Sequence, residues 1–137
     1  LKMIGRDNSS LDNQSKGKIL LVEDDFYIRS LYLMELESRG FKVYEASDAA
    51  QARNILSSCE VNLILLDVML PGERGIELLE WLKKQPQYRE VKIVMLSNVW
   101  DDEVIERAKT LGATDYLLKS RTTPQEVANR VGALLPQ

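Results

Sequence analysis

Histidine is absent from all 137 residues of the chain. Its absence excludes the Ser-His and Cys-His pairs of common hydrolases, imidazole acid-base catalysis and histidine-ligated zinc. A metal ion would have to be held by oxygen atoms, which favours Mg²⁺, Mn²⁺ or Ca²⁺. A phosphohistidine that donates to this chain would have to belong to another protein.

Cysteine, basic charge and long apolar runs are also scarce. The single cysteine, Cys59, excludes an internal disulfide and a site with several cysteine ligands. The formal net charge of -3 gives no basic footprint for nucleic acid. No apolar run approaches membrane-spanning length and no secretory signal opens the sequence, so the expected location is the cytoplasm.

From Lys18 onward the sequence alternates between strand and helix patterns. The predicted strands are residues 18–23, 42–46, 62–67, 91–96 and 115–118, and the predicted helices are residues 26–39, 48–58, 75–84, 101–111 and 123–135. Five such units in series predict an α/β domain with a parallel sheet covered on both faces. The doubly wound order for five strands is 2-1-3-4-5, with its switch point between the first and third strands. Residues 1–17 are polar and are predicted to be a flexible N-terminal tail or an expression remnant, and residues 18–137 to be the domain.

Local signals mark the faces and ends of these helices. Residues at helical spacing predict the packed face of the first helix: Ile28, Leu31, Tyr32 and Leu36. Gly40 and Gly112 stand where a left-handed residue would end a helix. Thr123 and Glu126 fit a capping box at the start of the last helix, with a proline at its first position.

Acidic residues and a lysine stand where the predicted strands end. Glu23 and Asp24 follow the first strand, Asp67 closes the third, and Lys119 follows the fifth. Because the carboxyl ends of parallel strands share one edge of the sheet, these side chains are expected to converge. Carboxylates held close together repel one another unless a cation neutralises them, and Mg²⁺ accepts such ligands together with a backbone carbonyl. The sequence therefore predicts a site for a hard divalent cation and a phosphoryl group.

Ser97 and Lys119 could contact that phosphoryl group. Ser97 follows the fourth predicted strand, where its hydroxyl could donate a hydrogen bond, and the Lys119 ammonium could neutralise an oxygen. Taken singly, each residue has an ordinary alternative, since serine is common in turns and caps and lysine is common on surfaces.

Four segments of the chain resemble the receiver domain of two-component response regulators. They are residues 20–25, 65–72, 94–97 and 112–119, and the resemblance extends over about residues 18–135. It implies a flavodoxin-like receiver fold, a Mg²⁺ cofactor (or Mn²⁺ in its place), and a phosphoryl group taken from a sensor histidine kinase or phosphotransfer protein. It implies no enzyme activity beyond Mg²⁺-dependent self-phosphorylation and autodephosphorylation.

The resemblance also assigns roles to the residues of the site. Asp67 matches the phosphoacceptor, and Glu23 and Asp24 match the Mg²⁺-binding pair. The backbone carbonyl of Met69 matches a further metal ligand. Lys119 matches the lysine that contacts the phosphoryl group.

Ser97 matches the switch hydroxyl of the family, and Tyr116 matches the switch aromatic. Phosphorylation is expected to draw in Ser97, let Tyr116 fill the vacated space, and reshape the surface of the fourth helix, fifth strand and fifth helix. The same surface could form a homodimer, with Asp115 and Arg130 as candidate partners. The domain itself is expected to touch neither nucleic acid nor membrane.

Two residues depart from the pattern of the family. Ser120 follows Lys119 where the family usually has proline, often after a cis peptide bond, so a trans turn of different shape is an alternative. Asn98 stands where the family often has a small residue and could hinder access to the site.

Two other functions are alternatives to that of a receiver domain. A phosphatase-like hydrolase is disfavoured because Met69 offers no second acid after Asp67. A receiver-like interaction module that is never phosphorylated is the other alternative.

Overall fold

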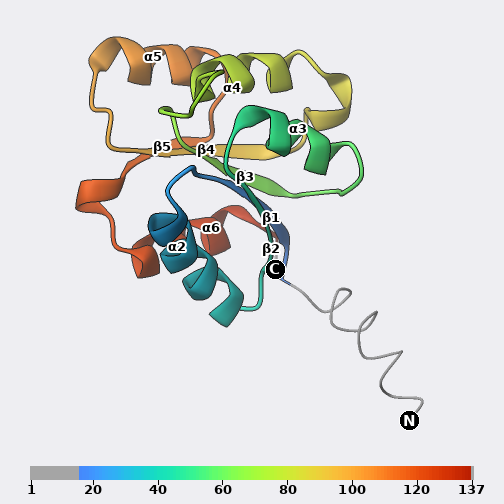
Figure 1. Cartoon of the computed structure of the whole chain (residues 1–137), viewed down its shortest axis with the longest axis vertical. Helices are drawn as coiled ribbons and strands as arrows, with labels where there is room; N and C mark the ends of the chain where they lie inside the picture. Colours follow the sequence, from blue (N-terminus) through green and yellow to red (C-terminus); the bar gives the residue numbers. More distant parts are fainter. Residues whose placement is uncertain (1–15, 137) are drawn as a thin grey trace.

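Five parallel strands form the centre of the protein in the computed structural model, which describes residues 16–136 (Figure 1). They are β1 (Lys18–Val22), β2 (Lys42–Ala46), β3 (Leu63–Leu66), β4 (Lys92–Ser97) and β5 (Asp115–Leu118). Every neighbouring pair is parallel, and the order across the sheet is β2-β1-β3-β4-β5. The doubly wound order predicted from the sequence is confirmed, with its switch point between β1 and β3.

Helices cover both faces of this sheet. The α-helices are α2 (Phe26–Ser38), α3 (Ala49–Leu56), α4 (Gly75–Lys83), α5 (Asp102–Thr110) and α6 (Pro124–Leu134), with short 3-10 helices η1 (Pro86–Tyr88) and η2 (Lys119–Arg121). Figure 1 shows α2 and α6 on one face and α3, α4 and α5 on the other. The two layers follow from right-handed crossovers on either side of the switch point.

The apolar core lies in two clusters, one on each face of the sheet. Alternate residues of β1 and β3 supply both clusters. Leu20 and Ile64 pack toward α3, α4 and α5, whereas Leu21 and Leu65 pack toward α2 and α6. Continuous apolar runs such as Leu63–Leu66 are buried along their whole length, as expected for parallel strands covered on both sides.

The predicted packed face of α2 was wrong at one position. Tyr32 and Leu36 are buried, but Leu31 is 57% exposed. Successive residues in an α-helix are rotated by about 100°, so Leu31 points well away from the buried Tyr32 side. The predicted helix ends are confirmed, since Gly40 and Gly112 have φ values of 94° and 100°.

The start of the domain is described from Lys16. The Lys16 N–H donates to the Gly40 carbonyl at 3.1 Å, and the Lys42 N–H donates to the Gly17 carbonyl at 2.9 Å. The rest of the predicted N-terminal tail, residues 1–15, lies outside the described residues. Within residues 16–136, no helix has both the length and the apolar character needed to cross a membrane.

Candidate functional site

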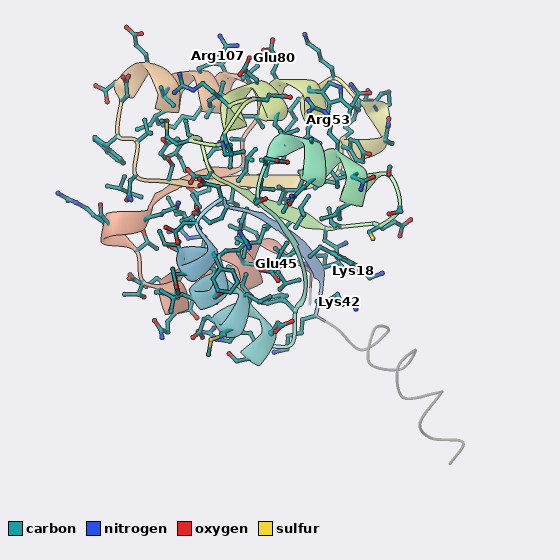
Figure 2. The ribbon with its side chains drawn as sticks, viewed as in Figure 1. Lys18, Lys42, Glu45, Arg53, Glu80 and Arg107 are labelled. Atoms are coloured by element: carbon teal, nitrogen blue, oxygen red, sulfur yellow. The ribbon has the colours of Figure 1, made fainter. Side chains whose placement is uncertain are left out.

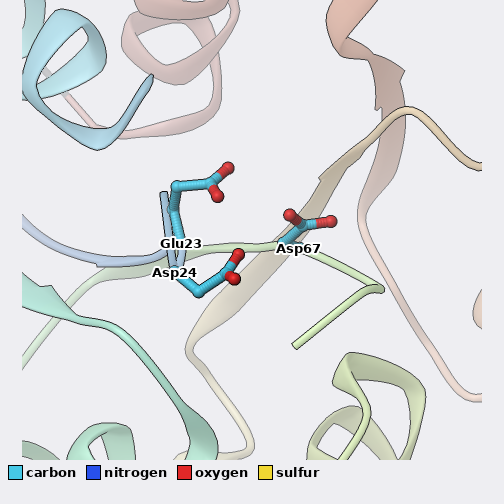
Figure 3. Close-up of side chains that lie close together, drawn as sticks. All are labelled: Glu23, Asp24 and Asp67. Atoms are coloured by element: carbon cyan, nitrogen blue, oxygen red, sulfur yellow. The ribbon is translucent and has the colours of Figure 1, made fainter. Parts of the chain in front are cut away.

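Three carboxylates meet at the carboxyl edge of the sheet (Figure 3). Glu23 and Asp24 follow β1 and Asp67 follows β3, and one oxygen from each lies within 4.8 Å of the other two. Glu23 and Asp67 are 3% and 6% exposed, whereas Asp24 is open to solvent. This set of oxygen donors, partly buried and partly accessible, fits a hard divalent cation.

Lys119 reaches this cluster from the end of β5. Its Nζ donates to Oδ2 of Asp67 at 2.7 Å and also to Oε1 of Glu23. Burial works to lower the pKa of Lys119, but the hydrogen bonds to Asp67 and Glu23 outweigh it, and the pKa lies above its ordinary value. A charged ammonium is therefore held against the carboxylate that is predicted to accept the phosphoryl group.

Glu23 is the most buried acid of the cluster. Burial raises the pKa of Glu23, although the hydrogen bonds from Lys119 and from the Asp25 N–H work to lower it. Arg29 holds the same residue from its backbone side, because the guanidinium donates to the Glu23 carbonyl at 2.7 Å and to Glu45 at 3.0 Å. Arg29 was not among the site residues predicted from the sequence. The available signal was a basic residue one turn into the helix that follows the acidic pair.

Asp25 lies next to the acidic pair but does not join the cluster. Its side chain accepts hydrogen bonds from the N–H groups of Tyr27 and Ile28 at 2.9 and 3.0 Å, so it caps the start of α2. The cap fixes where α2 begins and thereby holds the chain that leaves Glu23 and Asp24.

The start of α4 approaches the backbone of Asp67 so closely that it requires glycine. A Cβ on Gly75 would lie 1.9 Å from the Asp67 carbonyl oxygen. The Gly75 N–H donates to the Val68 carbonyl at 2.9 Å, and the Met69 N–H donates to Oδ1 of Asp67 at 3.1 Å. The backbone of Met69 therefore lies beside the Asp67 carboxylate, while the Met69 side chain is 56% exposed. Gly75 was not among the site residues predicted from the sequence.

Ser97 and Tyr116 both hold the backbone of Val99. Ser97 is fully buried at the end of β4, and its Oγ accepts a hydrogen bond from the Val99 N–H at 3.1 Å. The Tyr116 hydroxyl donates to the Val99 carbonyl at 2.5 Å. Burial raises the pKa of Tyr116. The sequence predicted these two residues on neighbouring strands, which the β4–β5 register confirms. Val99, the residue that both side chains contact, was not predicted.

The regions that depart from the family pattern have ordinary backbone geometry. Every described peptide bond is trans, including Lys119–Ser120, and η2 leads directly into the Thr123 cap of α6. Asn98 is exposed. Arg130 and Asp115, proposed from the sequence as partners across a dimer, form an ion pair with each other inside this chain.

Comparison with known proteins agrees with this geometry. Residues 19–131 match the family model for the response regulator receiver domain. The phosphate regulon transcriptional regulatory protein PhoB of Escherichia coli K12 is 38% identical over 118 residues, which is 86% of this chain and 51% of PhoB. The chain therefore spans about half the length of the curated relatives it matches.

Solved structures with the same fold include a BeF3-activated receiver domain and a Mn²⁺-bound response regulator. The BeF3-activated N-terminal receiver domain of Klebsiella pneumoniae RstA is 32% identical, with a TM-score of 0.79 over 88% of this chain and 99% of that one. The Mn²⁺-bound form of response regulator Rcp1 is 25% identical, with a TM-score of 0.78 over 88% and 99% of the two chains. The chain therefore belongs to the response regulator receiver domains, the phosphoacceptor modules of two-component signalling.

Proposed function

We propose that Asp67 accepts the phosphoryl group and that the donor is a phosphohistidine of a sensor histidine kinase or phosphotransfer protein. The observation that carries the proposal is the convergence of three carboxylates and Lys119 at one edge of a receiver fold. In the transfer, an Asp67 oxygen forms a bond to phosphorus while the phosphorus–nitrogen bond of the donor breaks. The imidazole leaves with the electron pair of that bond.

The residues around Asp67 prepare it for this reaction. Lys119 donates to one carboxylate oxygen and the Met69 N–H to the other, so the carboxylate is oriented before a donor arrives. Lys119 can then contact a phosphoryl oxygen, and the Ser97 hydroxyl has a proton to donate besides the hydrogen bond it accepts. Glu23, Asp24, Asp67 and the Met69 carbonyl would hold Mg²⁺, which supplies neutralisation of the charge on the phosphoryl group.

Phosphorylation of Asp67 can be tested with a small-molecule donor. Acetyl phosphate and Mg²⁺ should add one acid-stable, base-labile phosphoryl group, detected by intact-mass analysis. Asp67→Asn should abolish the adduct. An adduct that persists at full yield in that variant would contradict the assignment, and no adduct in the wild type would favour the interaction module that is never phosphorylated.

Binding of the metal can be tested by its effect on stability. A ligand that binds only the folded protein raises the melting temperature, so millimolar Mg²⁺, on the order of the excess needed over a weak Kd, should stabilise the wild type. Asp24→Ala should remove most of that gain, because Asp24 is the exposed ligand and contributes little to the fold. Equal stabilisation of the variant would show that Asp24 is not a ligand. The Mn²⁺-bound form of Rcp1 supports Mn²⁺ as a substitute.

The proposed output surface consists of α5, β5 and α6, which are the fourth helix, fifth strand and fifth helix predicted from the sequence. A phosphate mimic such as beryllofluoride should shift amide resonances across these elements, because Ser97 and Tyr116 share Val99 and Tyr116 lies on β5. Ser97→Ala should still bind the mimic but lose most of the remote shifts. Shifts confined to the neighbours of Asp67 would mean that the domain is phosphorylated without switching.

The apolar surface of α2 is proposed as the docking site of the phosphodonor protein. Large exposed apolar side chains gather on this helix: Phe26, Tyr27, Leu31 and Met34. The patch begins directly after the Asp25 cap, and the chain segment before that cap carries Glu23 and Asp24. A donor that must bring its phosphohistidine to Asp67 would cover this surface, and burial of apolar area would contribute to its affinity.

Three further expectations from the sequence remain predictions. They are the extent of the receiver domain over residues 18–137, a cytoplasmic location, and a homodimer through α5, β5 and α6. We infer no enzyme activity beyond Mg²⁺-dependent self-phosphorylation and autodephosphorylation.

A further inference from the structure

An ion pair outside the carboxylate cluster joins the loop after Asp67 to the helical layer above it. The Arg53 guanidinium, on α3, donates to the two carboxylate oxygens of Glu73 at 2.6 and 2.5 Å. The same guanidinium lies 4.6 Å from the ring centroid of Trp81 on α4. Figure 2 labels Arg53 on the outer side of α3. The Arg53 guanidinium therefore bonds to the loop, while its attachment to α3 and its contact with Trp81 on α4 restrict its position.

The loop between β3 and α4 is held firmly at both ends but weakly in the middle. Val68 and Leu70 are 0% and 8% exposed, and Gly75 bonds back to Val68 at 2.9 Å. The turn 71–74 is mostly exposed, and Gly72 within it has a left-handed φ of 76°. Among the hydrogen bonds and ion pairs of residues 16–136, only Arg53–Glu73 ties a side chain of this turn to an element other than α4 or the loop itself.

We propose that Arg53 and Glu73 are positioning residues for phosphorylation, because they hold this loop with the Met69 backbone beside Asp67. The inference rests on the proposed function of Asp67. A bidentate guanidinium–carboxylate pair is directional, and the stacked Trp81 ring restricts the guanidinium further. A loop held in this way needs no reorganisation when the metal and phosphoryl group bind. Coupling is reciprocal, so metal binding should also stabilise the Arg53–Glu73 pair.

The test compares Mg²⁺ affinity in single variants of the pair with affinity in a matched control. Arg53→Gln and Glu73→Gln should each weaken Mg²⁺ binding about three- to tenfold, below the 10- to 100-fold typical of partners bonded directly to a metal ligand. The acetyl phosphate rate should fall with the affinity. Arg39→Gln is the control, because Arg39 also pairs with a half-buried carboxylate, Glu35 at 2.9 Å, but on the opposite layer. Its Mg²⁺ affinity should stay within about twofold of wild type, as expected for a distant, independent site.

Calorimetry should be done at a temperature where circular dichroism shows every variant folded. The double variant Arg53→Gln with Glu73→Gln should bind Mg²⁺ no more weakly than the worse single variant, because the two residues act as one unit. If Arg53→Gln fails to fold, Arg53→Lys keeps the charge, loses the bidentate geometry and should show the same loss of affinity.

The outcomes separate this inference from the proposed function. If the variants of Arg53 and Glu73 bind Mg²⁺ as tightly as the wild type and only melt at a lower temperature, the ion pair stabilises the fold but does not position the site. That result would overturn the inference. The proposed function would then still stand. Absence of Mg²⁺ binding and phosphorylation in the wild type would overturn both.

Discussion

The two helical layers present different surfaces to solvent. On α2, Leu31 and Met34 are 57% and 68% exposed although they are apolar. The opposite layer is tied together by ion pairs, in which Arg53 bonds Glu73 and Arg107 of α5 bonds Glu80 of α4 at 3.0 Å (Figure 2). Apolar side chains gain free energy when a partner covers them, whereas exposed ion pairs gain little from being covered. The exposed apolar face of α2 is therefore suited to being covered by a partner, whereas Arg53 in the opposite layer is suited to holding the loop after Asp67.

Among the predicted changes, Gly75→Ala in the α3–α5 layer should cause the largest loss in the free energy of unfolding. The new Cβ would lie 1.9 Å from the Asp67 carbonyl oxygen, which is backbone and cannot rotate away. We expect a loss of about 3 kcal/mol or more in the free energy of unfolding, at the upper end of overpacking effects. Urea unfolding followed by circular dichroism measures it. A loss under about 1 kcal/mol, the usual single-mutation effect, would mean that α4 can start elsewhere.

Replacing Leu31 and Met34 together by Ser should affect partner binding and little else. Both side chains are exposed, so the free energy of unfolding should change by about 0.5 kcal/mol or less. Phosphotransfer from the cognate donor protein should fall about tenfold, equivalent to about 1.4 kcal/mol of lost binding. The rate with acetyl phosphate should stay the same. Arg107→Gln on the other layer is the control, and an equal loss of transfer in it would remove the distinction between the layers.

Gly132→Ala should stabilise the α2–α6 layer. Gly132 lies inside α6, and a Cβ there would meet the Phe41 ring at 3.9 Å, which is ordinary van der Waals contact. Alanine is favoured over glycine in a helix interior by about 0.8–1 kcal/mol. A higher urea midpoint is therefore expected. A lower midpoint would show that α6 packs more tightly against Phe41 than this distance indicates.

The smallest expected effect is a pH dependence at the start of α6. The Glu126 carboxylate accepts a hydrogen bond from the Thr123 N–H, which lowers the pKa of Glu126 below the ordinary 4.5, and the Thr123 side chain contributes to the same shift. Because the folded pKa is the lower one, this contribution to stability is present above pH 4.5 and is lost as the pH falls through the folded pKa. The melting-temperature difference between wild type and Glu126→Gln should therefore shrink below pH 4.5. A difference that does not change with pH would mean that the Glu126 charge contributes nothing.

The sequence predicted the sheet order and the convergence at its edge because the alternation of strands and helices is a local pattern and the doubly wound order follows from that alternation. Apolar runs marked the strands, and the polar residue after each run marked its carboxyl end. Leu31 was misplaced because the position of α6 against α2 decides which part of an apolar stripe is buried. Val99 and Gly75 were missed for a similar reason, since their roles depend on how closely segments distant in the chain approach each other.

The sharing of Lys119 between two carboxylates sets the charge balance of the site. Three carboxylates and one ammonium leave two negative charges unbalanced, and a bound divalent cation would cancel them. The proposed conversion of the Asp67 carboxylate to an acyl phosphate dianion would add one further negative charge at the same place. Attraction between opposite charges is strong at a partly buried edge, so the phosphorylated protein should bind a divalent cation more tightly than the unmodified one.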